Sequence, residues 1–213
     1  MDTLGAGPPE GGILLFNGRD LSNWMTPDGE PAQWKVEEEI VEVAPRTGDI
    51  VTREVFMDFF LHVEFRCPDM PEATGQQKGN SGVYLQGRYE IQVLDSYGIS
   101  IPGLGDCGAI YNQYAPLVNA CRPALEWQTF DISFRAPRTS GPEVLEPARV
   151  TVLQNGLVIQ NNAQLEGVTG GAMDENVWMP GPLRLQDHGN LVAYRNIWAL
   201  PLPLEGSDTY EPR

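Results

Sequence analysis

The stretch "DFFLHVEFRCP", residues 58 to 68, alternates apolar and polar side chains with the two-residue period of a β-strand. Successive side chains of a strand point to opposite faces, so odd and even positions separate. The odd positions are Phe59, Leu61, Val63 and Phe65, and the even positions are Phe60, His62, Glu64 and Arg66. The pattern therefore predicts a strand with one face in a core and one polar face that ends in a guanidinium.

Other stretches indicate the same kind of element. "WQTFDISFRAP", residues 127–137, repeats the alternation, and "GPLRLQDHGNLVAYRNIWALPL", residues 181–202, predicts two strands around a polar turn. In "ARVTVLQNGLVIQNN" the pair Asn155-Gly156 supplies the positive φ angles of a type I′ hairpin turn. "WKVEEEIVEV", residues 34–43, predicts two short strands with a turn near Glu38 and Glu39, and "ILLFNGRDLSNW" predicts an edge strand.

About ten to twelve strands spread evenly along the chain, with no alternating helices that would imply a parallel sheet. Because each strand has one apolar face to bury, we expect an all-β, antiparallel two-sheet β-sandwich. Residues 13–204 are predicted to form a single domain, with a flexible leader at 1–12 and a polar tail at 205–213.

The formal charge of −15 argues against a nucleic-acid partner, because binding to phosphates requires a cationic surface. No run of about 18 apolar residues predicts a membrane span. Neutral ligands such as sugars remain open. The compartment is undecided; a periplasmic or secreted location is favoured if Met1 replaces a removed signal peptide.

Three cysteines, Cys67, Cys107 and Cys121, fit no metal-ligand spacing, and the two histidines make a structural zinc site improbable. No metal ligand set is therefore predicted. If Cys107 and Cys121 pair, closing a loop of roughly 15 residues would contribute about 3 kcal/mol. Three unpaired thiols fit the sequence equally well.

The polar residues of "KGNSGVYLQGRYEIQVLDSYG", residues 78–98, are candidates for a site. Glu90 and Gln92 share one strand face, although Gly87 marks a bulge or turn that would change the parity before it. In isolation Glu90 also reads as a solvated strand carboxylate. His188, in "QDHGN", fits either a turn histidine or a general base. Among the tryptophans, Trp178 is the one we assign to a sugar-binding platform.

Six stretches in this order resemble the 3-keto-disaccharide hydrolase family, long catalogued as a domain of unknown function. They are "LFNGRDLSNW", "FFLHVEFR", "NSGVYLQGRYEIQVLDSYG", "CGAIYNQYAPLVNACRPALEWQTFDISFRAP", "VLQNG" and "LRLQDHGNLVAYRNI". The resemblance covers essentially the whole predicted domain. It implies a jelly-roll sandwich similar to the concanavalin A-like lectins and glucanases, with a concave binding sheet.

The resemblance also implies action on glycosides that are already oxidised at C3. A ketone at C3 acidifies the C2 hydrogen, so a base can remove it and the C1 aglycone can leave by β-elimination, with water adding afterwards if hydration follows. The polar motifs of the family fall on Arg66, Asn80, Ser81, Glu90, Gln92, Asp95, Tyr111, Gln186, Asp187 and His188.

We expect Glu90 or His188 to be the base and Arg66 and Gln92 to donate to the ketone oxygen. Asp95 would orient a partner or a hydroxyl, and Asn80 and Ser81 would shape the turn before the strand. Related glucanases carry the pattern Glu-x-Asp-x-Glu, which places nucleophile, helper and acid on one strand face at the positions that here read Glu90, Gln92 and Leu94. A second carboxylate is missing from that face, so an ordinary retaining mechanism is not expected.

Two other readings remain open. A non-catalytic carbohydrate-binding module would use the same concave face without a base, and a structural sandwich would have no sugar site. The fold allows a structural calcium ion, but no acidic loop here has the ligand spacing that argues for one.

Overall fold

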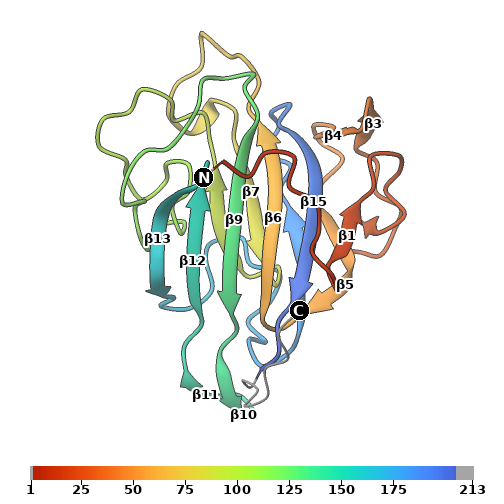
Figure 1. The fold of residues 1–213 in the computed structure, drawn as a ribbon, viewed down its shortest axis with the longest axis vertical. Helices are drawn as coiled ribbons and strands as arrows, with labels where there is room; N and C mark the ends of the chain where they lie inside the picture. Colours follow the sequence, from red (N-terminus) through yellow and green to blue (C-terminus); the bar gives the residue numbers. More distant parts are fainter. Residues whose placement is uncertain (1, 205–213) are drawn as a thin grey trace.

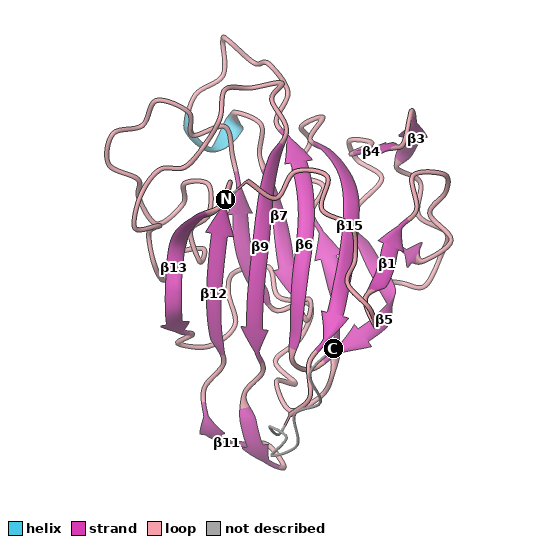
Figure 2. Ribbon diagram, viewed as in Figure 1, coloured by secondary structure: helices cyan, strands magenta, loops and turns pink. Residues whose placement is uncertain are grey.

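Two antiparallel sheets face each other in the computed structural model, which describes residues 2–204. The eight-stranded sheet lies at the front of Figure 1, with the second sheet behind it. Strands and loops make up nearly all of the chain in Figure 2, and no α-helix occurs within residues 2–204. The all-β, two-sheet sandwich predicted from the sequence is confirmed. The polar tail predicted for residues 205–213 lies outside the described residues.

The eight-stranded sheet has the order β13 (Leu157–Gln164), β12 (Arg149–Gln154), β9 (Gln128–Arg135), β6 (Phe59–Arg66), β15 (Ala193–Pro201), β4 (Ile40–Glu42) and β3 (Lys35–Glu37), with β1 (Ile13–Phe16) also paired to β15. The five-stranded sheet has the order β2 (Trp24–Met25), β5 (Ile50–Phe56), β14 (Gly181–Leu185), β7 (Ser81–Leu85) and β8 (Tyr89–Val93). A separate pair joins β10 (Arg138–Ser140) to β11 (Glu143–Glu146), and the 3-10 helix η1 spans Gly75–Gln77.

The core between the sheets is made by the apolar faces that the alternation predicted. Phe59, Leu61, Val63 and Phe65 of β6 are buried, and Phe65 packs on Phe130 of β9 with ring centroids 4.6 Å apart. The predicted hairpin turn is also present, since Asn155 and Gly156 adopt φ angles of 53° and 79° between β12 and β13. Local turn chemistry and two-residue periodicity together build this sheet.

The stretch at residues 78–98 folds as a β-hairpin rather than as one unbroken strand. Gln86 and Gly87 have φ angles of 52° and 67°, so the chain reverses between β7 and β8. The register pairs Tyr84 with Glu90 and Gly82 with Gln92. These side chains therefore share the outer face of the five-stranded sheet, while their neighbours in the sequence enter the core.

Residues 2–6 lie across the outer face of the eight-stranded sheet, where the beginning of the chain passes in front of β9, β6 and β15 in Figure 1. Thr3 Oγ1 donates to Asp131 Oδ2 over 2.5 Å, and Gly5 N donates to Glu64 Oε1 over 2.6 Å. His62, predicted on a polar outer face, is fully buried beneath this segment and bonds Asp131 through Nδ1 over 2.7 Å. The prediction of a flexible leader did not include these contacts.

Candidate active site

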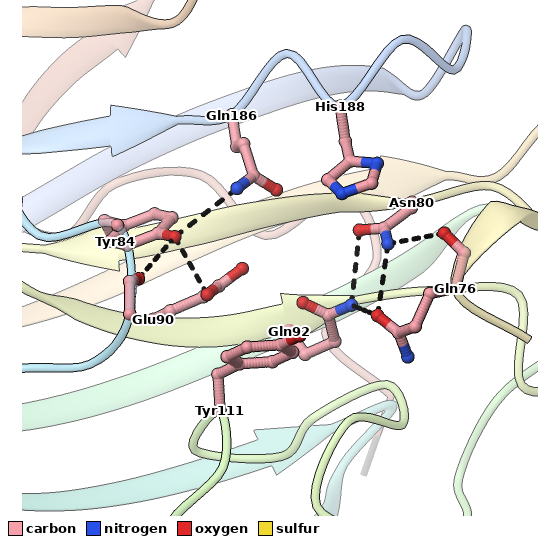
Figure 3. A pocket seen from close by; sticks show the side chains of 10 residues that line it. Gln76, Asn80, Tyr84, Glu90, Gln92, Tyr111, Gln186 and His188 are labelled. Atoms are coloured by element: carbon pink, nitrogen blue, oxygen red, sulfur yellow. Dashed lines mark hydrogen bonds between the residues drawn. The ribbon is translucent and has the colours of Figure 1, made fainter.

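A pocket of about 280 Å³ opens on the outer face of the five-stranded sheet, over β7 and β8 (Figure 3). Its volume is just below the usual range of about 300–1,000 Å³ for small-molecule sites and fits one sugar ring better than several. The pocket is lined by Gln76, Asn80, Tyr84, Glu90, Gln92, Tyr111, Gly170, Gly171, Gln186 and His188. Six of the eleven residues named for a site from the sequence are in this set.

Tyr84 and Glu90 form the floor of the pocket. Their strands are paired, and the Tyr84 hydroxyl donates to Glu90 Oε2 over 2.8 Å. The same hydroxyl lies 3.0 Å from the Gly170 carbonyl oxygen and accepts a hydrogen bond from Gln186 Nε2 over 3.4 Å. A phenol has one proton, so it donates to one of the two acceptors at a time. Within the described residues, Glu90 Oε1 has no hydrogen bond and is left for a ligand.

The Glu90 carboxyl group titrates near neutral pH. Burial raises the pKa of Glu90 to about 7, against partial opposition from the Tyr84 hydrogen bond and from the positive charge of Arg184. Burial and the adjacent Glu90 carboxylate also raise the pKa of the Tyr84 phenol, so Tyr84 stays a neutral donor. A carboxyl group with a pKa near 7 is suited to take a proton at physiological pH.

Three amide side chains form one wall of the pocket. Gln92 Nε2 donates to Gln76 Oε1 over 3.1 Å and to Asn80 Oδ1 over 3.2 Å, and Asn80 Nδ2 donates to the Gln76 carbonyl oxygen over 2.7 Å. Gln92 Oε1 is buried and has no hydrogen-bond partner among the described residues. The same is true of Gln186 Oε1 across the pocket. Two buried acceptors thus face a cavity that a hydroxyl-bearing ligand could enter.

Gln186 and His188 reach the pocket from the loop that follows β14 (Figure 3). Ser81 Oγ donates to the Gln186 carbonyl oxygen over 2.6 Å, and Asp187 N donates to Asp49 Oδ1 over 2.8 Å, which fixes the loop on both sides. No hydrogen bond of the His188 ring occurs within residues 2–204, so both ring nitrogens are available to a ligand. Tyr111 enters from the opposite side, where Tyr111 N donates to the Glu90 carbonyl oxygen over 3.1 Å.

Five residues named for the site do not line the pocket, and one of them, Ser81, supports the backbone at Gln186 as described above. Arg66 is at the end of β6 in the other sheet, with its guanidinium 4.9 Å from the centroid of the Trp127 ring, so the predicted donation to a ketone does not fit. Asp95 pairs with Lys78 Nζ over 3.0 Å, and Asp187 is bonded to the backbone of Gly48. Trp178 is partly exposed but does not line the pocket.

Tyr84 and Gln76 line the pocket although the sequence did not place them in a site. Only the hairpin register shows that Tyr84 shares a sheet face with Glu90, because the turn at Gly87 determines which residues of β7 lie on that face. Gln76 belongs to the 3-10 helix η1 and has no periodic signal. The backbone segment at Gly170 and Gly171 was missed for the same reason.

The three cysteines are free thiols in this structure, so the disulfide considered for Cys107 and Cys121 is not formed. Gln154 Nε2 donates to both sulfurs, over 3.5 Å and 3.4 Å, so the two thiols are held beside one amide. Within the described residues no group of three or more His, Cys, Asp or Glu side chains is arranged to hold a metal ion. A structural calcium ion stays a prediction. No helix among residues 2–204 is both long and apolar enough to cross a membrane.

Comparison with known proteins shows a match over nearly the whole described chain. The model of the 3-keto-alpha-glucoside-1,2-lyase-like domain family matches residues 11–200. The chain is 39% identical to a candidate glycosyl hydrolase from Parabacteroides distasonis ATCC 8503, covering 91% of this chain and 85% of that one, with a TM-score of 0.84. A second candidate glycosyl hydrolase from that organism is 22% identical over 91% and 95% of the two chains, with a TM-score of 0.66, and shows the fold alone. No curated protein matches the chain.

Proposed function

The chain belongs to the 3-keto-alpha-glucoside-1,2-lyase-like domain family, and we propose that it cleaves 3-keto-glycosides by C2 proton abstraction and β-elimination of the C1 aglycone. Family membership and the 39% identity to a candidate glycosyl hydrolase support a carbohydrate-active enzyme that acts on glycosides. The observation that carries the finer proposal is the buried carboxyl group of Glu90, which faces the pocket without a second carboxylate among the described lining residues.

A single base is sufficient for this reaction. Removing the C2 proton leaves an enolate whose negative charge rests on the C3 oxygen. When the enolate collapses, the C1–O bond breaks, a C1=C2 double bond forms, and the aglycone oxygen takes a proton. Addition of water across the double bond would give the free keto sugar. Donors near the C3 oxygen and the aglycone oxygen would complete the site.

Glu90 is the base in this proposal. Its Oε2 is held by Tyr84, which leaves Oε1 to take the proton. Because the pKa of Glu90 is raised to about 7 by burial, its carboxylate is a stronger base than an exposed one and is still half ionised at neutral pH. Tyr84 fixes the carboxylate plane, as an orienting partner does for other catalytic bases.

His188 is the acid in this proposal. It lines the same pocket, and its ring nitrogens have no hydrogen-bond partner within residues 2–204. An imidazolium can protonate an aglycone oxygen at neutral pH, whereas a tyrosine with a raised pKa is a poorer acid. The alternative, with His188 as the base, would leave the buried Glu90 without a role.

The amide groups are proposed to bind the sugar hydroxyls. Gln92 was expected to donate to the ketone, but its Nε2 donates to Gln76 and Asn80 instead. The atoms left for a ligand are Gln92 Oε1 and Gln186 Oε1, which accept hydrogen bonds. Each matches a hydroxyl group, and filling both would remove the cost of leaving buried acceptors unpaired.

A conventional glycosidase mechanism does not fit this pocket. Retaining and inverting enzymes both need a pair of carboxyl groups, at about 5–5.5 Å or about 6.5–9.5 Å respectively. Glu90 is the one acidic residue among the described lining residues. Elimination from a keto sugar requires one carboxylate and is therefore favoured.

Gly82 makes room for the base, which gives a first prediction. A Cβ atom at Gly82 would lie 2.5 Å from Glu90 Oε1 and 3.0 Å from Tyr84 Cε2, so Gly82→Ala must displace the Glu90 carboxylate. We expect this variant to fold and to lose about 10²-fold in kcat/KM, the scale of an approximately 1 Å misplacement of a catalytic group. The matched control is Gly7→Ala, because Gly7 is exposed, has open space around it and has no positive φ angle. Equal activity of Gly82→Ala and the wild type would contradict the assigned position of Glu90.

The proposal is tested with pairs of substrates. The protein is incubated with a 3-keto-glucoside and with its unoxidised parent glucoside, and release of the aglycone is followed. Release from the keto sugar alone is expected. Release from the parent alone would indicate a conventional glycosidase. Release from neither would contradict the proposal that the protein is a glycoside-cleaving enzyme. Binding of both without release would indicate a carbohydrate-binding module.

A further inference from the structure

We propose that Arg184, anchored by Asp49, is a positioning residue that holds the Tyr84–Glu90 pair and keeps Glu90 in its proton-accepting form. The inference rests on the function proposed above, since it concerns the base of that reaction. Neither Arg184 nor Asp49 lines the pocket. They lie beside it and act through Tyr84.

Arg184, Tyr84 and Glu90 form one row across three neighbouring strands. Arg184 of β14 pairs in register with Tyr84 of β7, and Tyr84 pairs with Glu90 of β8. The guanidinium carbon lies 3.7 Å from the centroid of the Tyr84 ring, and Arg184 is buried. A desolvated guanidinium over an aromatic face attracts the ring and fixes its plane. The Tyr84 hydroxyl is thereby aimed at Glu90 Oε2.

Asp49 holds the guanidinium in place and ties it to the rim of the pocket. Arg184 Nε forms an ion pair with Asp49 Oδ2 over 3.1 Å. The contact does not have hydrogen-bond geometry, so Arg184 Nε–H has no hydrogen-bond partner among the described residues. Asp49 Oδ1 accepts a hydrogen bond from Asp187 N over 2.8 Å. One carboxylate therefore connects the cation beside Tyr84 to the loop that presents His188.

The charges around Glu90 explain why the cation matters. The titratable and charged groups that face it from the surrounding elements are Tyr84, Tyr111, Arg184, Asp49 and His188. Arg184 is the permanent cation of this set. Burial and the negative charge of Asp49 favour the neutral carboxylic acid, whereas the positive charge of Arg184 favours the carboxylate. Without Arg184, more of the base would be protonated at neutral pH.

Two charge-removing variants separate this role from simple packing. Arg184→Met removes the cation and keeps a long apolar chain over Tyr84. Asp49→Asn removes the anion and keeps an oxygen that can accept from Asp187 N. Arg184→Lys retains the charge, and Arg53→Met is the matched control, since Arg53 is an exposed arginine of the same sheet. The pKa of Glu90 is measured in each protein by ¹³C NMR titration of labelled glutamate, with the resonance identified by its absence in Glu90→Gln.

The pKa of Glu90 is expected to shift in opposite directions in Arg184→Met and Asp49→Asn. Arg184→Met should raise the pKa of Glu90 by about one unit or more, and Asp49→Asn should lower it, because a neighbouring charge shifts a carboxyl group on this scale. Arg184→Lys and Arg53→Met should leave it near the wild-type value. The acid limb of the pH profile of kcat/KM should move alkaline in Arg184→Met, with an approximately tenfold loss on the acid side. Shifts of the same sign in both charge variants, or none, would overturn the inference.

The NMR titration distinguishes this inference from the proposed function. It reports the proton affinity of Glu90 whether or not any substrate is turned over. Opposite shifts in a protein that cleaves no 3-keto-glycoside would support the electrostatic role of Arg184 and contradict the reaction. If Arg184→Met does not fold, Arg184→Gln, which also removes the cation but keeps a polar side chain, takes its place, and the same rise in the pKa of Glu90 is expected.

Discussion

Replacing Glu90 with glutamine is expected to lower the rate of aglycone release from a 3-keto-glucoside by about 10²–10⁴-fold, the usual contribution of a general base. Glutamine retains an oxygen that can accept from Tyr84 but cannot take the C2 proton. The rate is measured at saturating and at limiting substrate. We expect the loss in kcat, with little change in KM. Activity within about threefold of the wild type would exclude Glu90 as the base.

The same substitution is expected to stabilise the fold, which separates lost catalysis from lost structure. Burial raises the pKa of Glu90 from 4.5 to about 7, so the folded protein loses stability relative to the unfolded chain as pH rises between these values. A neutral glutamine has no such loss. At pH 8 Glu90→Gln should therefore be more stable by up to about 3 kcal/mol in urea unfolding, and the two proteins should converge near pH 4. If Glu90→Gln were much less stable than the wild type at pH 8, it would contradict a free-energy cost of burying the Glu90 carboxylate.

Replacing His62 with leucine is expected to give the largest loss of stability, about 3–5 kcal/mol. His62 is fully buried, with Nδ1 2.7 Å from Asp131 Oδ1 and Nε2 3.6 Å from Glu64 Oε1. Leucine would leave the buried side of both carboxylates without its partner. Residues 2–6, which bond the same two carboxylates, should become easier to cleave by protease. Urea unfolding at pH 6 measures the effect.

The pH dependence and a matched control test this assignment. Burial alone would lower the pKa of His62, but the hydrogen bond with Asp131 and the nearby Glu64 carboxylate raise it above 6.5. Its stabilising contribution is therefore full below 6.5 and is lost as pH rises through the folded pKa, so the difference between wild type and variant should narrow at alkaline pH. Ser133→Ala, an exposed substitution on β9, should change stability by less than about 0.5 kcal/mol. If the difference in unfolding free energy between the wild type and His62→Leu widened as pH rises, it would contradict a positively charged His62.

Strands with strict alternation were predictable from the sequence, and strands without it were not. β9 has every apolar residue on one face and β6 has all but Phe60 there, and the Asn155-Gly156 turn identifies its hairpin without further context. β5 (Ile50–Phe56) was not assigned, because its buried residues occur as a run of three at one end and a single residue at the other. β2, β10 and β11 are too short to show a period.

Six of the ten residues that line the pocket could be named from the sequence, and the set stayed incomplete because a strand pattern gives the face of a side chain but not the sheet. Arg66 was grouped with Glu90 since both are polar residues of strands, yet β6 and β8 belong to opposite sheets. Long-range pairing of strands decides that assignment. Tyr84 depended on the turn at Gly87, and His62 depended on the chain end that folds over it. A sequence pattern does not contain these distant contacts.

The most direct test of the proposed elimination follows the hydrogen at C2. A 3-keto-glucoside carrying deuterium at C2 is treated with the protein, and the sugar product is analysed by mass spectrometry against an enzyme-free control that corrects for spontaneous exchange. Elimination predicts complete loss of the deuterium with aglycone release and a slower rate for the labelled substrate. Release of the aglycone with the deuterium retained at C2 would show direct hydrolysis and would contradict the assignment of Glu90 as a C2 base.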